Sequence, residues 1–138
     1  MAATFSLQIV TPEREVYNAA VESVSLPGSD GGFGVMRSHA PLIAALEAGQ
    51  VTLFDAEAKP LHLAVGGGFF QVIANQAIIL ADSAETSAEI NVERARAAES
   101  RARARLAGQM EPEGKLQRDR ADAALKRAVV RQKVAAGK

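Results

Sequence analysis

The residues best suited to chemistry in this chain are arginines. Five of them lie within residues 90–107, in a segment that is rich in alanine and holds only two glutamates. A guanidinium group binds phosphate or carboxylate oxygens through parallel N–H donors, so such a cluster suggests an anionic ligand. Three interpretations compete for these side chains: a nucleic-acid backbone, a single small anion such as a nucleotide phosphate, or a helix face that meets only water.

Spacing separates four arginines from the rest. Arg94 and Arg101 are seven residues apart and therefore share one face of a helix. Arg127 and Arg131 are four residues apart on a second helix. In an antiparallel hairpin that turns near residue 111, the start of the first helix lies beside the end of the second. Arg94, Arg127 and Arg131 are then expected to converge near the positive N-terminal end of the first helix, where an anion is favoured.

The charge distribution argues against a nucleic-acid partner. Residues 1–84 hold three basic and eight acidic side chains, a balance of −5, whereas residues 85–138 hold thirteen basic and eight acidic ones, a balance of +5. The basic half contains no Phe, Tyr or Trp on which bases could stack, and its acidic groups interleave with the basic ones. We therefore expect no nucleic acid, and for most of the arginines a solvated face is the simpler interpretation.

No catalytic or metal-binding constellation is present in the sequence. The chain has no cysteine and only two histidines, His39 and His62, which excludes a structural zinc site and disulfides. The glycine-rich residues 27–34 lack the lysine and hydroxyl of a phosphate-binding loop and are expected to form a turn. Ser38 is adjacent to His39, and adjacent side chains of an extended segment point in opposite directions. We therefore expect no metal and no enzymatic activity.

Membrane segments are not expected either. No window approaches the roughly 18 apolar residues that span a bilayer. Residues 1–15 lack the basic region, apolar run and cleavage site of a signal peptide. The sequence therefore predicts a cytoplasmic chain that meets a membrane only through a partner.

The first half of the chain has the pattern of a β-protein. Turn-forming sequences, among them residues 27–34 and the three glycines 66–68, separate short apolar or alternating segments. Many short strands without intervening helices indicate an antiparallel β-sandwich or flattened barrel. The predicted strands are residues 5–10, 21–26, 51–54, 61–65, 69–74 and 77–82.

The hydrophobic period becomes helical after residue 85, so we predict a β-sandwich domain, 1–85, and a helical domain, 86–138. Gly108 and residues 111–114 interrupt the helical pattern, which predicts an antiparallel hairpin of two helices. Alanine-rich faces bury little area at about 25 cal/mol per Å². The hairpin is therefore expected to be weakly held and able to move. Its predicted apolar stripes are Val92, Ala95, Ala102 and Leu106, and Ala121, Leu125, Ala128 and Val129.

Four segments together carry a resemblance to a known family: residues 26–53, 65–72, 77–85 and 90–98. In this order they resemble the epsilon subunit of bacterial-type F-type ATP synthases, the counterpart of the mitochondrial delta subunit. The pattern G-x-x-G-x-x-x-x-H-A-P-L and the late I-N-x-x-R-A segment carry most of the likeness. The family's fold, a β-sandwich followed by a two-helix hairpin, agrees with the elements predicted above. Ser38 departs from the family, which commonly has glycine before the histidine, and costs some backbone freedom.

The resemblance implies a non-catalytic subunit of the central stalk, at the cytoplasmic face of the bacterial plasma membrane. Its expected partners are the gamma subunit and the c-ring, and also the alpha/beta catalytic head when the hairpin extends to restrain ATP hydrolysis. The role would be to couple proton-driven rotation to ATP synthesis. The alternative is an autonomous nucleotide-binding sensor. The expected interface with gamma and the c-ring, in which Phe33 is an exposed anchor, comprises Ser29, Asp30, Gly31, Gly32, Phe33, His39, Pro41 and Leu42.

The resemblance also implies that ATP could bind as a regulatory ligand, without being an obligatory cofactor. Asn91 departs from the family motif, which has aspartate at this position. Asparagine caps a helix about as well as aspartate, but its amide replaces a carboxylate as a nucleotide contact. The positions that match the family's ATP site are Glu85, Ile90, Asn91, Arg94, Ala95, Arg101, Arg127 and Arg131.

Overall fold

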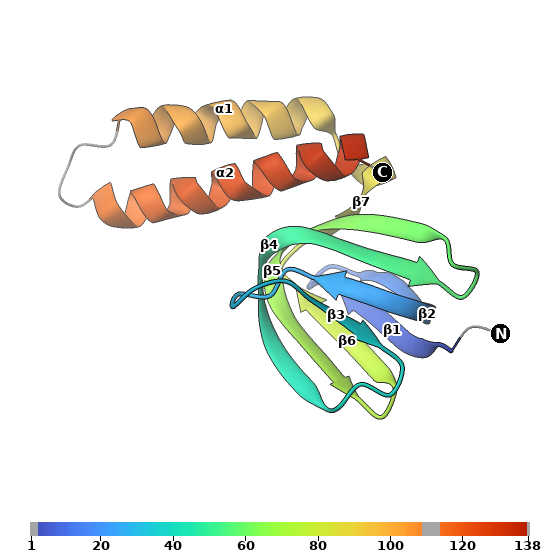
Figure 1. Cartoon of the computed structure of the whole chain (residues 1–138). Helices are drawn as coiled ribbons and strands as arrows, with labels where there is room; N and C mark the ends of the chain where they lie inside the picture. The colour runs from blue at the N-terminus through green and yellow to red at the C-terminus, as the bar shows by residue number, and fades with distance from the viewer. Residues whose placement is uncertain (1–2, 109–113, 138) are drawn as a thin grey trace.

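A computed structural model describes residues 3–108 and 114–137. A β-barrel built from the first part of the chain carries a helical hairpin built from the second (Figure 1). The strands are β1 (Phe5–Val10), β2 (Glu15–Leu26), β3 (Phe33–Met36), β4 (Leu42–Asp55), β5 (Pro60–Ile73), β6 (Gln76–Ala81) and β7 (Ala84–Thr86). The helical elements are the 3-10 helix η1 (Ser87–Glu89) and the helices α1 (Val92–Gly108) and α2 (Gly114–Gly137).

The sheet closes on itself as a flattened barrel. Hydrogen-bonded neighbours follow the order β1-β6-β5-β4-β2, and β1 also pairs with β2 and completes the ring. All pairs in this ring are antiparallel except β1 and β6, which are parallel. A closed ring of five strands cannot alternate direction all the way round, so one parallel pair is required. The predicted sandwich or flattened barrel is confirmed, with this single departure from a fully antiparallel arrangement.

Several strands are longer than the sequence pattern indicates. The predicted strands 61–65 and 69–74 are two halves of the single strand β5, because Gly67 and Gly68 continue the strand with φ of +110° and +144° instead of forming a turn. The first half of β5 pairs with β7 and the second half with β6, while β4 runs beside both. β5 therefore belongs to both layers of the barrel. The strand β3 and the first part of β4 were absent from the prediction.

The barrel core is made by the inward-facing residues of every strand. Phe70 is its largest fully buried side chain, and its ring meets that of Phe33 edge-on with centroids 5.9 Å apart. Alternate residues of β1 are buried, which confirms the alternation seen in the sequence. Other fully buried members of this core are Leu7, Ile9, Val21, Val35, Val51, Leu53, Leu63 and Ile79.

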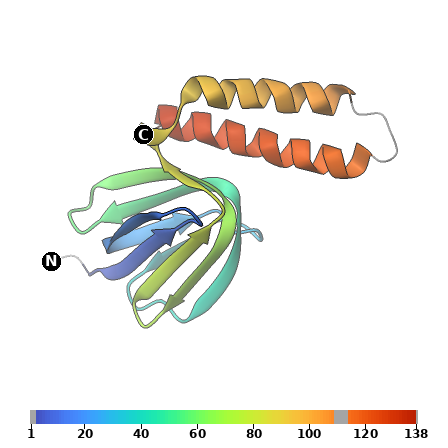
Figure 2. The same ribbon diagram turned by 180° about the vertical axis from the view of Figure 1, so that it is seen from behind.

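The two helices form the predicted antiparallel hairpin. α2 lies between α1 and the barrel, where it contacts β4 and β5, and α1 packs mainly on α2 (Figures 1 and 2). The two predicted stripes are narrower than expected because Val92 and Val129 are 36% and 39% exposed. The turn predicted at residues 111–114 falls almost wholly outside the described residues. The hairpin interface is alanine-rich, with Ala95, Ala102, Ala121 and Ala128 buried.

A short linker joins the barrel to the hairpin. The Thr86 side chain and the Glu89 carboxylate form a reciprocal capping box around η1, and the Arg14 guanidinium donates to Glu89 at 2.6 Å. The capping-box hydrogen bonds, above all that from the Thr86 backbone N–H, hold the pKa of Glu89 below its ordinary value of 4.5. The predicted domain boundary after residue 85 falls inside β7, which is part of the sheet. Neither described helix is long and apolar enough to cross a membrane.

Candidate functional site

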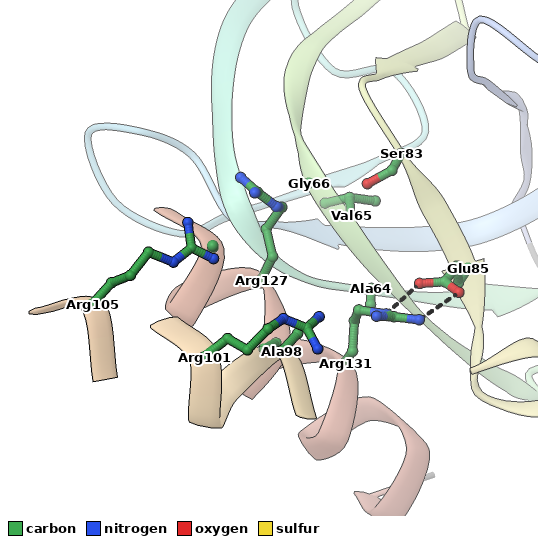
Figure 3. Close-up of a pocket in the computed structure, with 12 residues that line it drawn as sticks. Ala64, Val65, Gly66, Ser83, Glu85, Ala98, Arg101, Arg105, Arg127 and Arg131 are labelled. Carbon is green, nitrogen blue, oxygen red and sulfur yellow. Dashed lines mark hydrogen bonds and ion pairs between the residues drawn. The ribbon is translucent and has the colours of Figure 1, made fainter. Parts of the chain in front are cut away.

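A pocket of about 410 Å³ lies where the hairpin meets the barrel. Its floor is the segment of β5 from Ala64 to Gly66, together with Ser83 from the turn before β7 (Figure 3). A Cβ on Gly66 would collide with the Ser83 hydroxyl, so glycine lets the turn that carries Ser83 lie close against β5, and Cδ of Arg127 lies within contact distance of the same point. The charged groups that line the pocket are Arg101 and Arg105 of α1, Arg127 and Arg131 of α2, and Glu85 of β7.

Glu85 and Arg131 form the strongest polar contact of this pocket. Arg131 donates from Nε to Glu85 Oε1 at 2.7 Å and from its terminal nitrogen to Oε2 at 3.2 Å. Both side chains are largely shielded from water, with 25% of Arg131 and 30% of Glu85 exposed. This two-point geometry is stronger and more specific in orientation than a single hydrogen bond. Figure 3 shows both hydrogen bonds as dashed lines.

The predicted arginines do not all reach one pocket. Arg94 lines a second hollow of about 460 Å³ together with Arg101 and Arg131, whereas Arg127 lines only the first. Arg101 and Arg131 are shared between the two hollows. The predicted convergence of Arg94, Arg127 and Arg131 is therefore wrong in one respect, because α2 directs Arg127 toward the barrel and away from the N-terminal end of α1.

Asn91 begins the first helix. Its side-chain oxygen accepts the backbone N–H of Arg94 at 3.0 Å, which is the predicted N-cap hydrogen bond. Two neighbouring positions of the family motif, Ile90 and Ala95, are buried, and Ile90 packs with Ala64 and Val134. Neither presents a polar side chain to the pocket, so both position the helix.

A polar contact also links the two helices. Glu99 of α1 accepts hydrogen bonds from Gln132 of α2 at 2.7 Å and from Arg103 at 2.8 Å. These hydrogen bonds, with that from Gln132 contributing most, hold the pKa of Glu99 below 4.5. Arg103 is thereby occupied on the hairpin surface and does not line either hollow.

Sequence reasoning missed two features of the pocket. Arg105 lines it because it follows Arg101 by one helical turn, a spacing that was visible in the sequence. The floor of Gly66 and Ser83 had no such signal, because it depends on how the hairpin docks. The arrangement of four guanidiniums with one carboxylate suits a polyanion, and the pocket lining offers no second carboxylate that could activate water for cleavage.

The predicted partner loop lies between β2 and β3. Ser29, Asp30, Gly31 and Gly32 are exposed there, as expected. Phe33 differs from its predicted role as an exposed anchor. Its ring is half-buried against the core and lies so close to Gly28 that a Cβ on this glycine would collide with it. A side chain that completes the core is not free to serve as an isolated docking residue.

The second predicted partner segment follows β3. Ser38 adopts a left-handed φ of +66°, which explains why glycine is common at this position in the family, and its N–H donates to Asn75 Oδ1 at 2.7 Å. His39 donates from Nδ1 to the Ala40 carbonyl at 2.6 Å, so its ring is engaged with the adjacent backbone. Pro41 is exposed and Leu42 is half-buried against the core.

The outer face of the barrel carries an apolar surface that the sequence interpretation missed. Phe69 of β5 is 58% exposed and pairs with Leu80 of β6, which is 52% exposed. Ile43 of β4 and Ile73 of β5 are also more than half exposed. An apolar surface of neighbouring side chains is typical of a protein interface. Only Ile43 lies in a segment that was not predicted as a strand, the first part of β4, whereas Phe69, Ile73 and Leu80 lie in predicted strands whose outer face was not examined for apolar residues.

The geometry defines a class of protein, a closed β-barrel with a C-terminal helical hairpin docked on it through an arginine-lined pocket. Residues 4–87 match the family ATP synthase, Delta/Epsilon chain, beta-sandwich domain. The chain is 50% identical over 133 residues to the ATP synthase epsilon chain of Moorella thermoacetica, covering 96% of this chain and 97% of that one. It is 42% identical over 134 residues to the epsilon chain of Nitratidesulfovibrio vulgaris, covering 97% of each. The chain therefore belongs to the ATP synthase epsilon chain family.

Solved structures show the same fold. A chain of the Euglena gracilis mitochondrial ATP synthase superposes with a TM-score of 0.78 at 20% identity, covering 91% of this chain and 78% of that one. A chain from the central stalk and c-ring of the Tetrahymena thermophila mitochondrial ATP synthase gives a TM-score of 0.60 at 13% identity, covering 94% and 95%. At these identities the likeness concerns the fold, which extends over both the barrel and the hairpin.

Proposed function

We propose that the chain is a non-catalytic central-stalk subunit of an F-type ATP synthase that helps to couple proton-driven rotation to ATP synthesis. The observation that carries this proposal is the 50% identity to an ATP synthase epsilon chain over 97% of that chain's length. The pocket supports it, because its arginines suit an anion and its one carboxylate, Glu85, is held by Arg131.

The proposed partners are the gamma subunit and the c-ring. The exposed loop 29–32, the segment 39–42 and the apolar surface around Phe69 and Leu80 are the candidate contacts. A subunit held in this way would lie at the cytoplasmic face of the bacterial plasma membrane, peripheral to it, and would meet the membrane only through the complex.

The hairpin is the proposed regulatory element. When it extends it would reach the alpha/beta catalytic head and restrain ATP hydrolysis. The alanine-rich contacts support this role, because a partner can redistribute two states only when they differ by a few kcal/mol.

Reconstitution tests this function. ATP hydrolysis by a catalytic head containing gamma is measured with the full chain and with a chain that ends at residue 90, so that the linker contact of Ile90 is retained. The full chain should lower the hydrolysis rate relative to the shortened one. Equal rates would remove the regulatory role, and failure of both chains to co-elute with gamma would remove the stalk role.

ATP is proposed as a regulatory ligand of the arginine pocket, held without being hydrolysed. Arg131→Ala should weaken ATP binding in calorimetry, because loss of a charge-assisted hydrogen bond costs about 1.5–3 kcal/mol. Arg103→Ala is the matched control, because Arg103 pairs with Glu99 and lies outside the pocket. Absence of ATP binding both to the natural chain and to Asn91→Asp, which restores the family motif, would refute the proposal.

The arginine pocket also favours a second candidate, an autonomous nucleotide-binding sensor. Size-exclusion chromatography separates the two functions. A stalk subunit should co-elute with gamma, whereas an autonomous sensor should bind ATP and elute alone.

A further inference from the structure

The surface of α2 that faces the barrel has two parts. At its C-terminal end, Val134 is fully buried with Ile90 and Ala64, and Val130 and Ala135 pack around them. Beside these residues, at Arg131, and farther from this end, at Lys126, the helix contacts the barrel through long charged side chains. The apolar part is small, so the remaining contacts decide how firmly the hairpin is docked.

Two ion pairs connect the charged part of α2 to the barrel. Arg131 binds Glu85 of β7 through two hydrogen bonds, as described above. Lys126 donates to Glu47 of β4 at 2.8 Å, with each side chain about half exposed. In both pairs the cation belongs to the hairpin and the carboxylate to the barrel.

Other charged side chains add to the positive charge on the hairpin side of this interface. Arg101, Arg105 and Arg127 line the same pocket as the Glu85–Arg131 pair, and all three belong to the hairpin. Their mutual repulsion is present whether or not the hairpin is docked, because the helices carry them together. Docking adds the attraction between this cationic surface and the two carboxylates.

We propose that the hairpin is latched to the barrel without any bound ligand, by the ion pairs Glu85–Arg131 and Glu47–Lys126. Glu85 acts as an internal anion that occupies Arg131 when the pocket holds no nucleotide. This inference rests on the proposed function only in taking the hairpin to be mobile. It adds that docking depends on ionic strength. It also adds that one of the two ion pairs that hold the hairpin, Glu47–Lys126, lies outside the pocket.

Salt distinguishes this latch from apolar docking. Added sodium chloride shortens the Debye length from about 10 Å at 0.1 M to about 3 Å at 1 M, which weakens the attraction of the cationic hairpin for the carboxylates of the barrel. Burial of apolar surface is not weakened in this way. The docked population should therefore fall as the salt concentration rises.

Energy transfer between two dyes can measure docking in the full chain without nucleotide. The natural chain has no cysteine, so Ser25→Cys on the barrel and Ala123→Cys on α2, both exposed positions, give two unique attachment sites. Transfer should be high at low salt and decrease as salt is added. Unchanged transfer across this range would overturn the proposal.

Charge reversal tests each pair. Glu47→Lys and Lys126→Glu should each reduce the ratio of docked to undocked hairpin by about two- to fivefold, as expected for an exposed pair. Glu85→Arg and Arg131→Glu should each reduce it by about tenfold or more, because the pair is shielded and doubly hydrogen-bonded. The Glu47→Lys/Lys126→Glu chain should recover docking, since it restores attraction with the signs exchanged.

Matched controls exclude an effect of net charge. Glu57→Lys reverses an exposed carboxylate in the β4–β5 turn, whose ion partner Lys59 is in the same turn, and Lys133→Glu reverses an exposed cation on α2. Neither should alter docking. The proposal is overturned if single reversals at the two pairs behave like these controls, or if the exchanged Glu47/Lys126 pair stays as undocked as the single variants. Circular dichroism confirms that each chain is folded.

The outcome is independent of the test of function. If the ion pairs control docking but the shortened chain restrains hydrolysis as well as the full chain does, the latch is supported and the regulatory role fails. If the full chain restrains hydrolysis and the shortened chain does not, but docking is unchanged by salt and by charge reversal, the regulatory role is supported and the latch fails.

Discussion

The side-chain oxygen of Asn91 accepts the backbone N–H of Arg94 at 3.0 Å. This hydrogen bond satisfies one of the free N–H groups at the start of α1 and defines where the hairpin begins. It also assigns Asn91 a structural role that is separable from any role in binding a nucleotide.

Removal of this cap should destabilise the first helix. Asn91→Ala is expected to lower the free energy of unfolding by about 0.5–2 kcal/mol, whereas Asn91→Asp should leave it nearly unchanged because aspartate caps equally well. Urea denaturation followed by circular dichroism measures both. An alanine variant as stable as the aspartate variant would contradict the assigned cap.

Phe33 should matter for the stability of the barrel itself. Because its ring packs edge-on against Phe70, Phe33→Asp is expected to lower the free energy of unfolding by about 2 kcal/mol or more. Ser29→Asp adds the same charge at an exposed position of the same loop and should have little effect. Thermal denaturation of the isolated chain compares the two, and equal melting temperatures would show that Phe33 is not part of the core.

Gly68 is expected to tolerate no side chain. Its φ of +144° is strained for any other residue, and a Cβ would collide with the carbonyl of Leu80 on the neighbouring strand. Gly68→Ala should therefore cost more than about 2 kcal/mol of stability. Gly32→Ala is the control, since the nearest atom to its Cβ is the Leu26 carbonyl oxygen at 3.6 Å. Denaturation midpoints that match for the two variants would argue against the tight approach of β5 to β6.

Acid should weaken the linker between barrel and hairpin. The pKa of Glu89 is lower in the folded chain than its ordinary value of 4.5, chiefly because its carboxylate accepts the backbone N–H of Thr86. A lowered folded pKa means that the carboxylate stabilises the fold above pH 4.5 and that this contribution is lost as the pH falls through the lowered value.

Glu89→Gln tests this dependence. The variant should be less stable than the natural chain at neutral pH and should lose less stability on acidification to about pH 3. Glu57→Gln removes an exposed carboxylate from the turn between β4 and β5 and serves as the control. The same acid-induced loss in the Glu89→Gln variant and the natural chain would contradict the assignment.

Local patterns predicted the parts of the fold that depend on local physics. The alternation in residues 5–10 and the helical spacing of the alanines each report which face is buried, and both agree with the structure. Three glycines in a row were misread as a turn, because the same left-handed angles serve either a turn or a strand that bends between two layers. The role of Phe33 could not be foreseen either, since its burial depends on its distant partner Phe70.

The candidate site was predictable to the same extent. Helical spacing identified Arg101 and Arg131 as members of a cationic cluster, and both line the pocket. The docking angle of the hairpin decides that Arg127 meets the barrel while Arg94 lines another hollow, and no pattern within one helix encodes that angle. The ion pair Glu47–Lys126 joins residues 79 positions apart and likewise arises only from the tertiary structure.

The strand β5 gives the molecule a mechanical property. One half of β5 presents Phe69 on the outer apolar surface, and the other half presents Ala64 beneath α2, while β4 is hydrogen-bonded along both halves. A force applied at the outer surface would therefore reach the seat of the hairpin through covalent and hydrogen-bonded backbone. Gly67 and Gly68, both with positive φ, lie between these two halves, so the connection between the two surfaces depends on residues that carry no side chain.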